Sequence, residues 1–225
     1  MPPDAPVLGF DTSAAHCAAG LFLAGRIAAR RAAPMQKGQA EHLFPMLEEL
    51  LADQGLTWRD LAAIGVGIGP GNFTGIRIAV SAARGLALSL GVPAIGVSSF
   101  DVLARGQGDG PLLLSLPAPR DQLYLQRHER GAALGGPEVM GDTLPPELGD
   151  LSGHRVIGHD TARIAALTGS ALPPLECSVT PDTFGSLIAE IASDRRARPF
   201  PRPAPLYVRP ADAAPMRDAA PAILP

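Results

Sequence analysis

The residues best suited to hold a charged ligand form a glycine-rich turn, Gly-Pro-Gly at residues 69–71. Hydrophobic residues alternate with glycines over residues 64–68, which predicts a short strand that runs into this turn. The apolar spacing over residues 75–90 predicts a helix that follows it. A strand, a glycine turn and a helix bring free backbone N–H groups and a helix N-terminus to one point, which is a geometry that binds phosphate.

Neither common nucleotide-binding fingerprint is present in this turn. It lacks the lysine and hydroxyl residue of G-x-x-x-x-G-K-[ST], and the glycines at 65, 67, 69, 71 and 75 do not match G-x-G-x-x-G. Glycines also cluster where the backbone needs a positive φ, or where a helix must approach a strand closely. Phosphate binding and close packing both remain open on these residues alone.

The block GPGNFTGIR, residues 69–77, closely resembles the G-P-G-S-F-T-G-L-R-I motif of the TsaB (YeaZ) family. Members of that family partner the TsaD transferase, which makes threonylcarbamoyladenosine on tRNA. Their fold is similar to that of actin, sugar kinases and heat-shock ATPases. The resemblance implies an α/β protein of two related half-domains, the second one reduced. We expect the halves at residues 1–104 and 105–211, with a flexible tail at 212–225.

The start of the chain predicts a meander of three strands over residues 7–31, and an aspartate ends the first strand. In the superfamily, an aspartate at this place lies near the metal and phosphates of ATP, and a strand-end carboxylate suits hydrated Mg²⁺. The resemblance implies no cofactor held by this chain alone, with ATP or ADP at the interface with the partner. A turn that satisfies its own backbone is the alternative. The candidate nucleotide and magnesium contacts are Asp11, Thr12, Ser13, Gly69, Gly71, Thr74 and Gly75.

The sequence shows no pair of residues suited to catalysis. His16 and Cys17 are neighbours on a predicted strand, so their side chains point to opposite faces and cannot act as base and nucleophile. TsaD proteins carry an H-x-x-x-H metal-binding pair where this chain has Ser99 and Leu103. The resemblance therefore implies a non-catalytic relative of the transferase, without a metal site.

Two predicted helices flank the glycine strand, Glu41–Gln54 with a stripe of leucines and Gly75–Leu90 with many alanines. Packing on the protein's own sheet is one interpretation of these faces. The resemblance implies the other, in which helices of this half bind TsaD or a second copy of the chain. The candidate partner contacts are Leu43, Met46, Leu47, Leu50, Arg77, Ala79, Ala82, Ala83, Arg84 and Leu86.

The second half is shorter and richer in proline. Strands at 112–116, 123–128 and 155–158, and helices at 160–167 and after Thr180-Pro181, fit a reduced half-domain. The family's D-A-R-x-x-E-V-Y loop reads PAPRDQLY here, so its charges are missing. Prolines predict an extended segment from Pro199 onward, where residues 205–209 resemble the P-x-Y-x-R that closes most family members.

Composition excludes several classes of function. A formal net charge of −3 and 4% aromatic residues provide no basic stripe or stacking platform, so tRNA is expected to bind only through the complex. The two cysteines have no C-x-x-C spacing, and no apolar run approaches the roughly 18 residues of a membrane span. We therefore expect a cytoplasmic protein that does not enter membranes.

The sequence thus predicts a scaffold subunit that binds and activates TsaD, joined by the TsaE ATPase, for transfer of threonylcarbamoyl to adenosine 37 of tRNAs that read ANN codons. Alone, it is expected to form a homodimer. Two alternatives stay open: a small-molecule kinase or ATPase of the same superfamily, and a glycoprotease-like peptidase.

Overall fold

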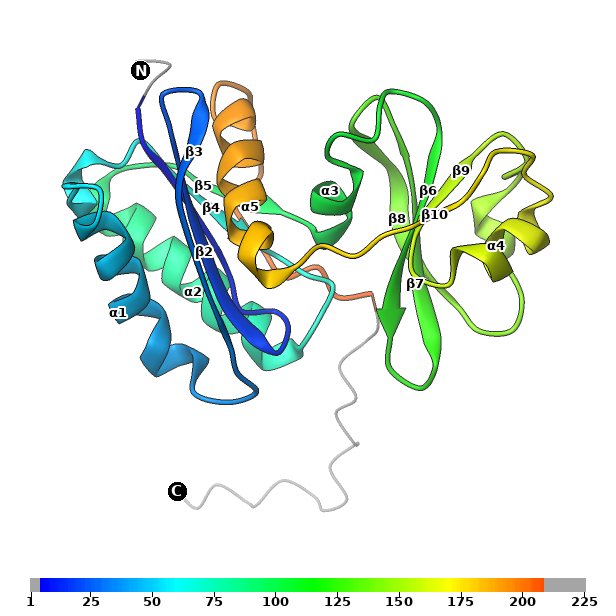
Figure 1. The fold of residues 1–225 in the computed structure, drawn as a ribbon, viewed down its shortest axis with the longest axis horizontal. Coiled ribbons are helices and arrows are strands. Elements are labelled where there is room, and N and C mark those ends of the chain that lie inside the picture. Colours follow the sequence, from blue (N-terminus) through cyan, green and yellow to red (C-terminus); the bar gives the residue numbers. More distant parts are fainter. Residues whose placement is uncertain (1–4, 209–225) are drawn as a thin grey trace, which may run out of the picture.

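The computed structural model describes residues 5–208, which form two α/β lobes (Figure 1). Each lobe is built on one five-stranded sheet. The first sheet has the order β3-β2-β1-β4-β5 and the second the order β10-β9-β6-β7-β8. This arrangement confirms the prediction of an α/β fold with two related halves.

The first sheet begins as the predicted meander. β1 pairs antiparallel with β2, β2 pairs antiparallel with β3, and a turn at Ala24-Gly25 with positive φ at both residues joins the last two. Two later strands add in parallel on the other side of β1, because each reaches the sheet through a helical crossover. The strands are β1 Val7–Asp11, β2 His16–Leu23, β3 Arg26–Pro34, β4 Ala63–Gly67 and β5 Ala94–Val97.

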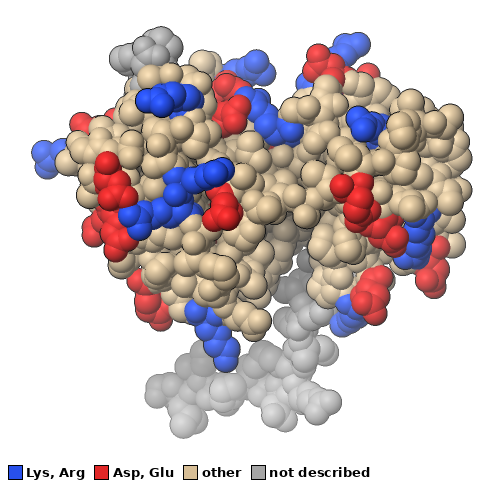
Figure 2. All heavy atoms as spheres, viewed as in Figure 1, with Lys and Arg blue, Asp and Glu red and all other residues tan. Residues whose placement is uncertain are grey.

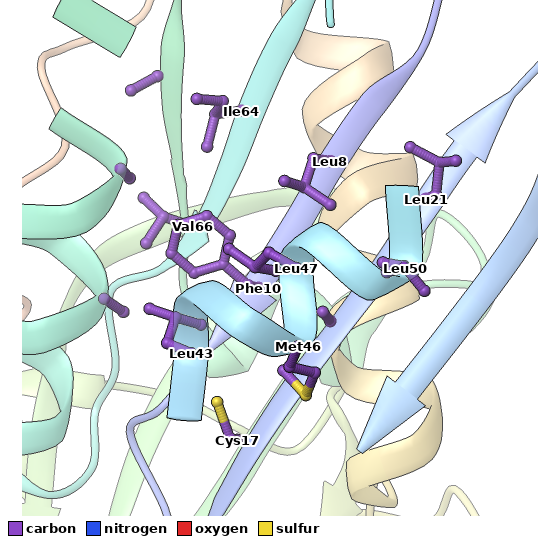
Figure 3. Packing of buried hydrophobic residues seen from close by; sticks show 14 of the residues in the cluster. Leu8, Phe10, Cys17, Leu21, Leu43, Met46, Leu47, Leu50, Ile64 and Val66 are labelled. Atoms are coloured by element: carbon purple, nitrogen blue, oxygen red, sulfur yellow. The ribbon is translucent and has the colours of Figure 1, made fainter. Parts of the chain in front are cut away.

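Two helices, α1 (Gln39–Ala52) and α2 (Phe73–Leu90), cover one face of the first sheet (Figure 1). Between them lies a short 3₁₀ helix, Trp58–Asp60, that begins with a capping box: the Asp60 carboxylate accepts from the Thr57 backbone N–H and hydroxyl. Side chains of α1 interdigitate with those of β1 and β4 (Figure 3). Phe10 and Leu47 are fully buried in this core.

The helix α5 (Pro181–Arg195) corrects the expected division of the chain. Its position in the sequence predicts that it belongs to the second half, but it packs across the other face of the first sheet. Gly9, Gly20 and Gly65 allow this close approach, because a Cβ atom at any of them would overlap atoms of α5. The first lobe therefore needs a helix from the far end of the sequence.

The second sheet contains the predicted strands and two that the sequence did not reveal, the hairpin strand β8 and the two-residue strand β10. β8 contains two adjacent glycines and a proline, which weaken its strand pattern. The second lobe also contains the helix α4 (Thr161–Thr168) and a 3₁₀ turn, Pro146–Leu148. The strands are β6 Leu112–Ala118, β7 Gln122–Glu129, β8 Ala132–Met140, β9 Arg155–Gly158 and β10 Leu175–Glu176.

The short helix α3 (Ser99–Ala104) connects the lobes. Its Phe100 is fully buried among side chains of β6, β7 and β9, so it belongs to the core of the second lobe. On the other side Asp101 accepts two hydrogen bonds from Arg195 of α5, at 2.7 and 3.1 Å. α3 is therefore fixed to both lobes.

Candidate functional site

The glycine turn packs directly against the end of β1. The Thr12 hydroxyl donates to the Gly75 carbonyl oxygen at 2.7 Å, and the Asn72 N–H donates to the Ser13 carbonyl oxygen at 2.6 Å. A Cβ atom on Gly71 would overlap the Ser13 carbonyl, and one on Gly75 would overlap the Thr12 carbonyl. These glycines are therefore required by close backbone packing, which was the alternative to phosphate binding.

Asp11 is fully buried beneath this turn. Its Oδ1 accepts from the backbone N–H and the hydroxyl of Ser13, both at 2.9 Å, and lies 2.9 Å from Nε2 of His16. Its Oδ2 is buried with no hydrogen-bond partner among the described residues. The carboxylate thus stabilises its own turn, as one of the two sequence interpretations predicted.

His16 and Cys17 lie on opposite sides of β2, as predicted. The His16 ring lines a cleft and packs against Phe184, with ring centroids 5.7 Å apart. Burial and the nearby charge of Asp11 raise the pKa of the Cys17 thiol to about 12, so it is not a nucleophile at neutral pH. Sequence reasoning missed the pair of Asp11 and His16, although the hairpin that joins β1 to β2 brings them together.

A cleft runs between the two lobes as two adjoining hollows of about 500 and 490 Å³. Both are lined by Ser13 and Gly71 from the first lobe and by Pro117 from the second. No lysine or arginine is among the described residues that line either hollow. Within residues 5–208, Glu176 supplies the only carboxylate that lines the cleft.

This cleft does not fit a nucleoside triphosphate with its magnesium. Asp11 is not exposed to it, and Asn72 already accepts a hydrogen bond from the Gly75 N–H at the start of α2. In the second lobe, Glu176 accepts from the Asp160 N–H, the Thr161 N–H and the Thr161 hydroxyl. The protein's own carboxylate therefore occupies the N-terminus of α4, where a phosphate would otherwise be favoured.

The positions that correspond to the transferase's metal-binding pair have structural roles here. The Ser99 hydroxyl donates to the Pro70 carbonyl oxygen at 3.3 Å, and Leu103 is buried in the second lobe's core. Within residues 5–208 we find no group of three His, Cys, Asp or Glu side chains placed to hold a metal ion.

Most of the predicted partner contacts do not lie on the surface, so the prediction is wrong for these residues. They lie at most 4% exposed and face the protein's own sheet, because the apolar stripes of α1 and α2 cover that sheet. The buried ones are Leu43, Met46, Leu47, Leu50, Ala79 and Ala83. Arg77 is exposed, and Ala82, Arg84 and Leu86 are half-buried.

The outward face of α2 is formed by other residues. Thr74, Ser81 and Gly85 are exposed along it, and Leu88 is 84% exposed. Phe44, 41% exposed, lies on the neighbouring helix α1 beside Trp58. Sequence periodicity identified the buried face of each helix, and the candidate surface is the opposite face.

A cluster of three residues fastens the C-terminal part of the chain to the first turn of α2. The Tyr207 and Phe73 rings stack with centroids 5.1 Å apart, and the Arg77 guanidinium lies 3.8 Å from the Phe73 ring centroid. Arg77 also donates to the Tyr207 hydroxyl at 2.8 Å. The predicted P-x-Y-x-R segment therefore reaches the glycine motif through Tyr207, while Arg209 lies outside the described residues.

Comparisons with known proteins support the family resemblance of the glycine motif. Residues 34–144 match the family model "TsaD: tRNA N6-adenosine threonylcarbamoyltransferase". The Escherichia coli protein named tRNA threonylcarbamoyladenosine biosynthesis protein TsaB is 33% identical over 150 residues, so the chain spans less than two thirds (63%) of that relative's length. An uncharacterised Mycobacterium tuberculosis protein, Rv3421c, is 34% identical over 93% of this chain and 94% of its own length.

Solved structures give the same result. YeaZ from Pseudomonas aeruginosa superimposes with a TM-score of 0.68 and 26% identity, over 90% of this chain and 99% of that one. The Escherichia coli relative and this structural relative carry the names of the family that the glycine motif resembles. The chain belongs to the TsaB (YeaZ) family, whose named members act in the biosynthesis of threonylcarbamoyladenosine on tRNA.

Proposed function

We propose that this chain is the non-catalytic subunit that binds and activates a TsaD-type transferase, with a TsaE-type ATPase joining the pair. The assembly would transfer threonylcarbamoyl to adenosine 37 of tRNAs that read ANN codons. In this proposal the protein is cytoplasmic, forms a homodimer when alone, and meets tRNA only within the complex. ATP or ADP is bound against the partner proteins rather than in the cleft of this chain.

The observation that carries the proposal is the outward face of α2. By length and composition this helix is apolar enough to cross a membrane, yet only five of its 18 residues are buried. Its buried side packs on the first sheet, while Ser81, Gly85 and Leu88 remain exposed. An exposed helix face that combines small residues with one exposed leucine favours a second helix that packs at close range.

Surface charge supports binding to protein rather than direct binding to RNA. Acidic and basic side chains are mixed on the face seen in Figure 2, and the formal net charge is −3. Because neutralisation of phosphates supplies most non-specific affinity for nucleic acid, such a surface is a poor RNA-binding site by itself. We therefore assign tRNA contacts to the assembled complex.

The kinase and peptidase alternatives have less support. A kinase needs a cleft that accepts phosphate and magnesium, and the lining described above does not fit them. A peptidase needs an activated nucleophile, and the Cys17 thiol is buried with a raised pKa.

Reconstitution tests the proposal. The TsaD-type transferase and TsaE-type ATPase of the same organism are assayed for threonylcarbamoyl transfer to tRNA, with and without this chain. We expect transfer to depend on the chain, while the chain alone shows neither transfer nor ATP hydrolysis. Full transfer without it, or ATP turnover by the isolated chain, would reject the scaffold role.

A further inference from the structure

A second surface lies on the flank of α2 that faces the C-terminal part of the chain. Residues 199–208, called here the return segment, run beside this helix without forming a helix or strand. A hollow of about 380 Å³ separates the return segment from the last two turns of α2 and the start of β5. It is lined by Arg84, Ala87, Leu88, Val92, Ala94, Phe200, Arg202 and Pro203.

The walls of this groove are fixed by the fold. The Leu206 N–H donates to the Ile68 carbonyl oxygen at 2.8 Å, which holds the return segment against the end of β4. Tyr207 binds Arg77 at the opposite end of α2, and Pro203 is buried. Because both walls are anchored, a ligand would find the groove already formed, which lowers the entropic cost of binding.

The charges of the groove are of one sign. Arg84 and Arg202 line it, and neither makes a hydrogen bond or ion pair with any residue in the described part of the chain. None of the described residues that line the groove is an aspartate or glutamate. Arg105 and Arg195, by contrast, are paired with carboxylates of α5 and α3. A bound partner with carboxylates would therefore supply the counter-charges that the chain lacks.

Apolar side chains also line the groove. Leu88 is 84% exposed, and Phe200 is half-buried beside it. A phosphate backbone would pair with the two arginines but would leave Leu88 in water. A protein segment with an apolar side chain between acidic residues satisfies both features.

We propose that this groove binds an acidic, apolar segment of a partner protein, with its carboxylates on Arg84 and Arg202 and an apolar side chain over Leu88. Arg84 and Arg202 lie outside the exposed face formed by Thr74, Ser81 and Gly85, whereas Leu88 belongs to both surfaces. The inference goes beyond the proposed transferase contact, and charge reversal at Arg84 and Arg202 tests it separately from that contact.

The test uses three fluorescein-labelled probes with the intact chain: a peptide of repeating Glu-Leu-Leu-Glu blocks, the same peptide with Lys for Glu, and single-stranded polyuridine RNA. Fluorescence anisotropy at physiological salt is expected to show the acidic peptide bound at least about tenfold more tightly than the other two. Equal binding of both peptides, no binding of the acidic peptide, or preferred binding of RNA would overturn the proposal.

Charge reversal locates the site. The double variant Arg84→Glu and Arg202→Glu should exchange the preference, so that the lysine peptide binds more tightly than the acidic one. The matched control, Arg26→Glu with Arg130→Glu, changes two exposed arginines elsewhere by the same charge and should keep the original preference. If the control exchanges the preference as well, the effect is one of net charge and the groove is not the site.

Leu88→Ser keeps the charges and removes the apolar contact. Since Leu88 is exposed, the fold should be unaffected, as checked by circular dichroism and thermal melting. The acidic peptide should lose affinity about threefold or more. Unchanged affinity would contradict the apolar part of the proposed contact.

Discussion

The Thr12 hydroxyl donates to the Gly75 carbonyl oxygen at 2.7 Å, across 63 positions of sequence. This hydrogen bond joins the end of β1 to the first turn of α2, and both partners are buried. The longest motif in the sequence is therefore a joint between a strand and a helix. Its glycines allow the strand end and the helix to approach closely. The helix α2, which this joint orients, carries the candidate partner surface.

The joint predicts opposite effects for two glycines of the same helix. Gly75→Ala should lower the free energy of unfolding by about 2 kcal/mol or more, since its Cβ would overlap the Thr12 carbonyl. Gly85→Ala should raise it by about 0.5–1 kcal/mol, because Gly85 has open space around it and alanine favours a helix. Urea unfolding measures both. A stable Gly75→Ala protein would contradict the packing role of the motif.

The cleft predicts weak nucleotide binding. Isothermal titration calorimetry with Mg-ATP and the isolated chain should show no binding in the micromolar range. None of the described residues that line the cleft is a lysine or arginine, and the Glu176 carboxylate occupies the N-terminus of α4. The TsaE-type ATPase of the same organism serves as the positive control. Micromolar affinity that Asp11→Ala abolishes would favour the kinase interpretation.

The cysteines should differ in reactivity. Burial raises the pKa of Cys17 to about 12, and its side chain is inaccessible, whereas Cys177 is half-buried and lines the cleft. Iodoacetamide at neutral pH should alkylate Cys177 in the folded protein and reach Cys17 only after denaturation. Mass spectrometry of tryptic peptides measures this order, and equal labelling of the folded protein would refute it.

The folded protein should become less stable in mild acid because His128 is buried. Burial, together with the positive charge of Arg195, lowers the pKa of His128 below its ordinary 6.5, although Asp101 opposes the shift. The unfolded chain then binds a proton that the folded chain resists, so the stability present above about pH 6.5 is lost as the pH falls.

Urea unfolding at several pH values tests this dependence. His128→Gln should flatten the decline below about pH 6.5, while His42→Gln, at an exposed position, should leave it unchanged. A residual slope is expected in His128→Gln because burial also lowers the pKa of His154. An identical slope in the His128 variant and the native chain would show that His128 does not contribute.

Local sequence patterns predicted most elements of the fold. The meander and the helix after the glycine turn are both encoded by neighbouring residues. The packing of α5 on the first sheet could not be predicted, because it depends on glycines at 9, 20 and 65, which lie more than a hundred residues away. Only the folded chain shows that these glycines meet one helix.

The candidate site was predicted less well for a related reason. Hydrophobic spacing locates the buried face of a helix but does not reveal which surface buries it. Ala83 is fully buried, so an arginine there would test folding rather than partner binding. Gly85 lies on the outward face with no atom near its missing Cβ, so a large side chain fits there in the isolated chain.

The most direct test of the central claim measures how tightly the TsaD-type transferase of the same organism binds the Gly85→Arg variant of this chain. Ala166→Arg, which places the same side chain on the exposed face of α4, is the matched control. Surface plasmon resonance should show native affinity for the control and a loss of at least about tenfold for Gly85→Arg, with both variants folded by circular dichroism. Native affinity in a folded Gly85→Arg protein would contradict the claim that the outward face of α2 binds the transferase.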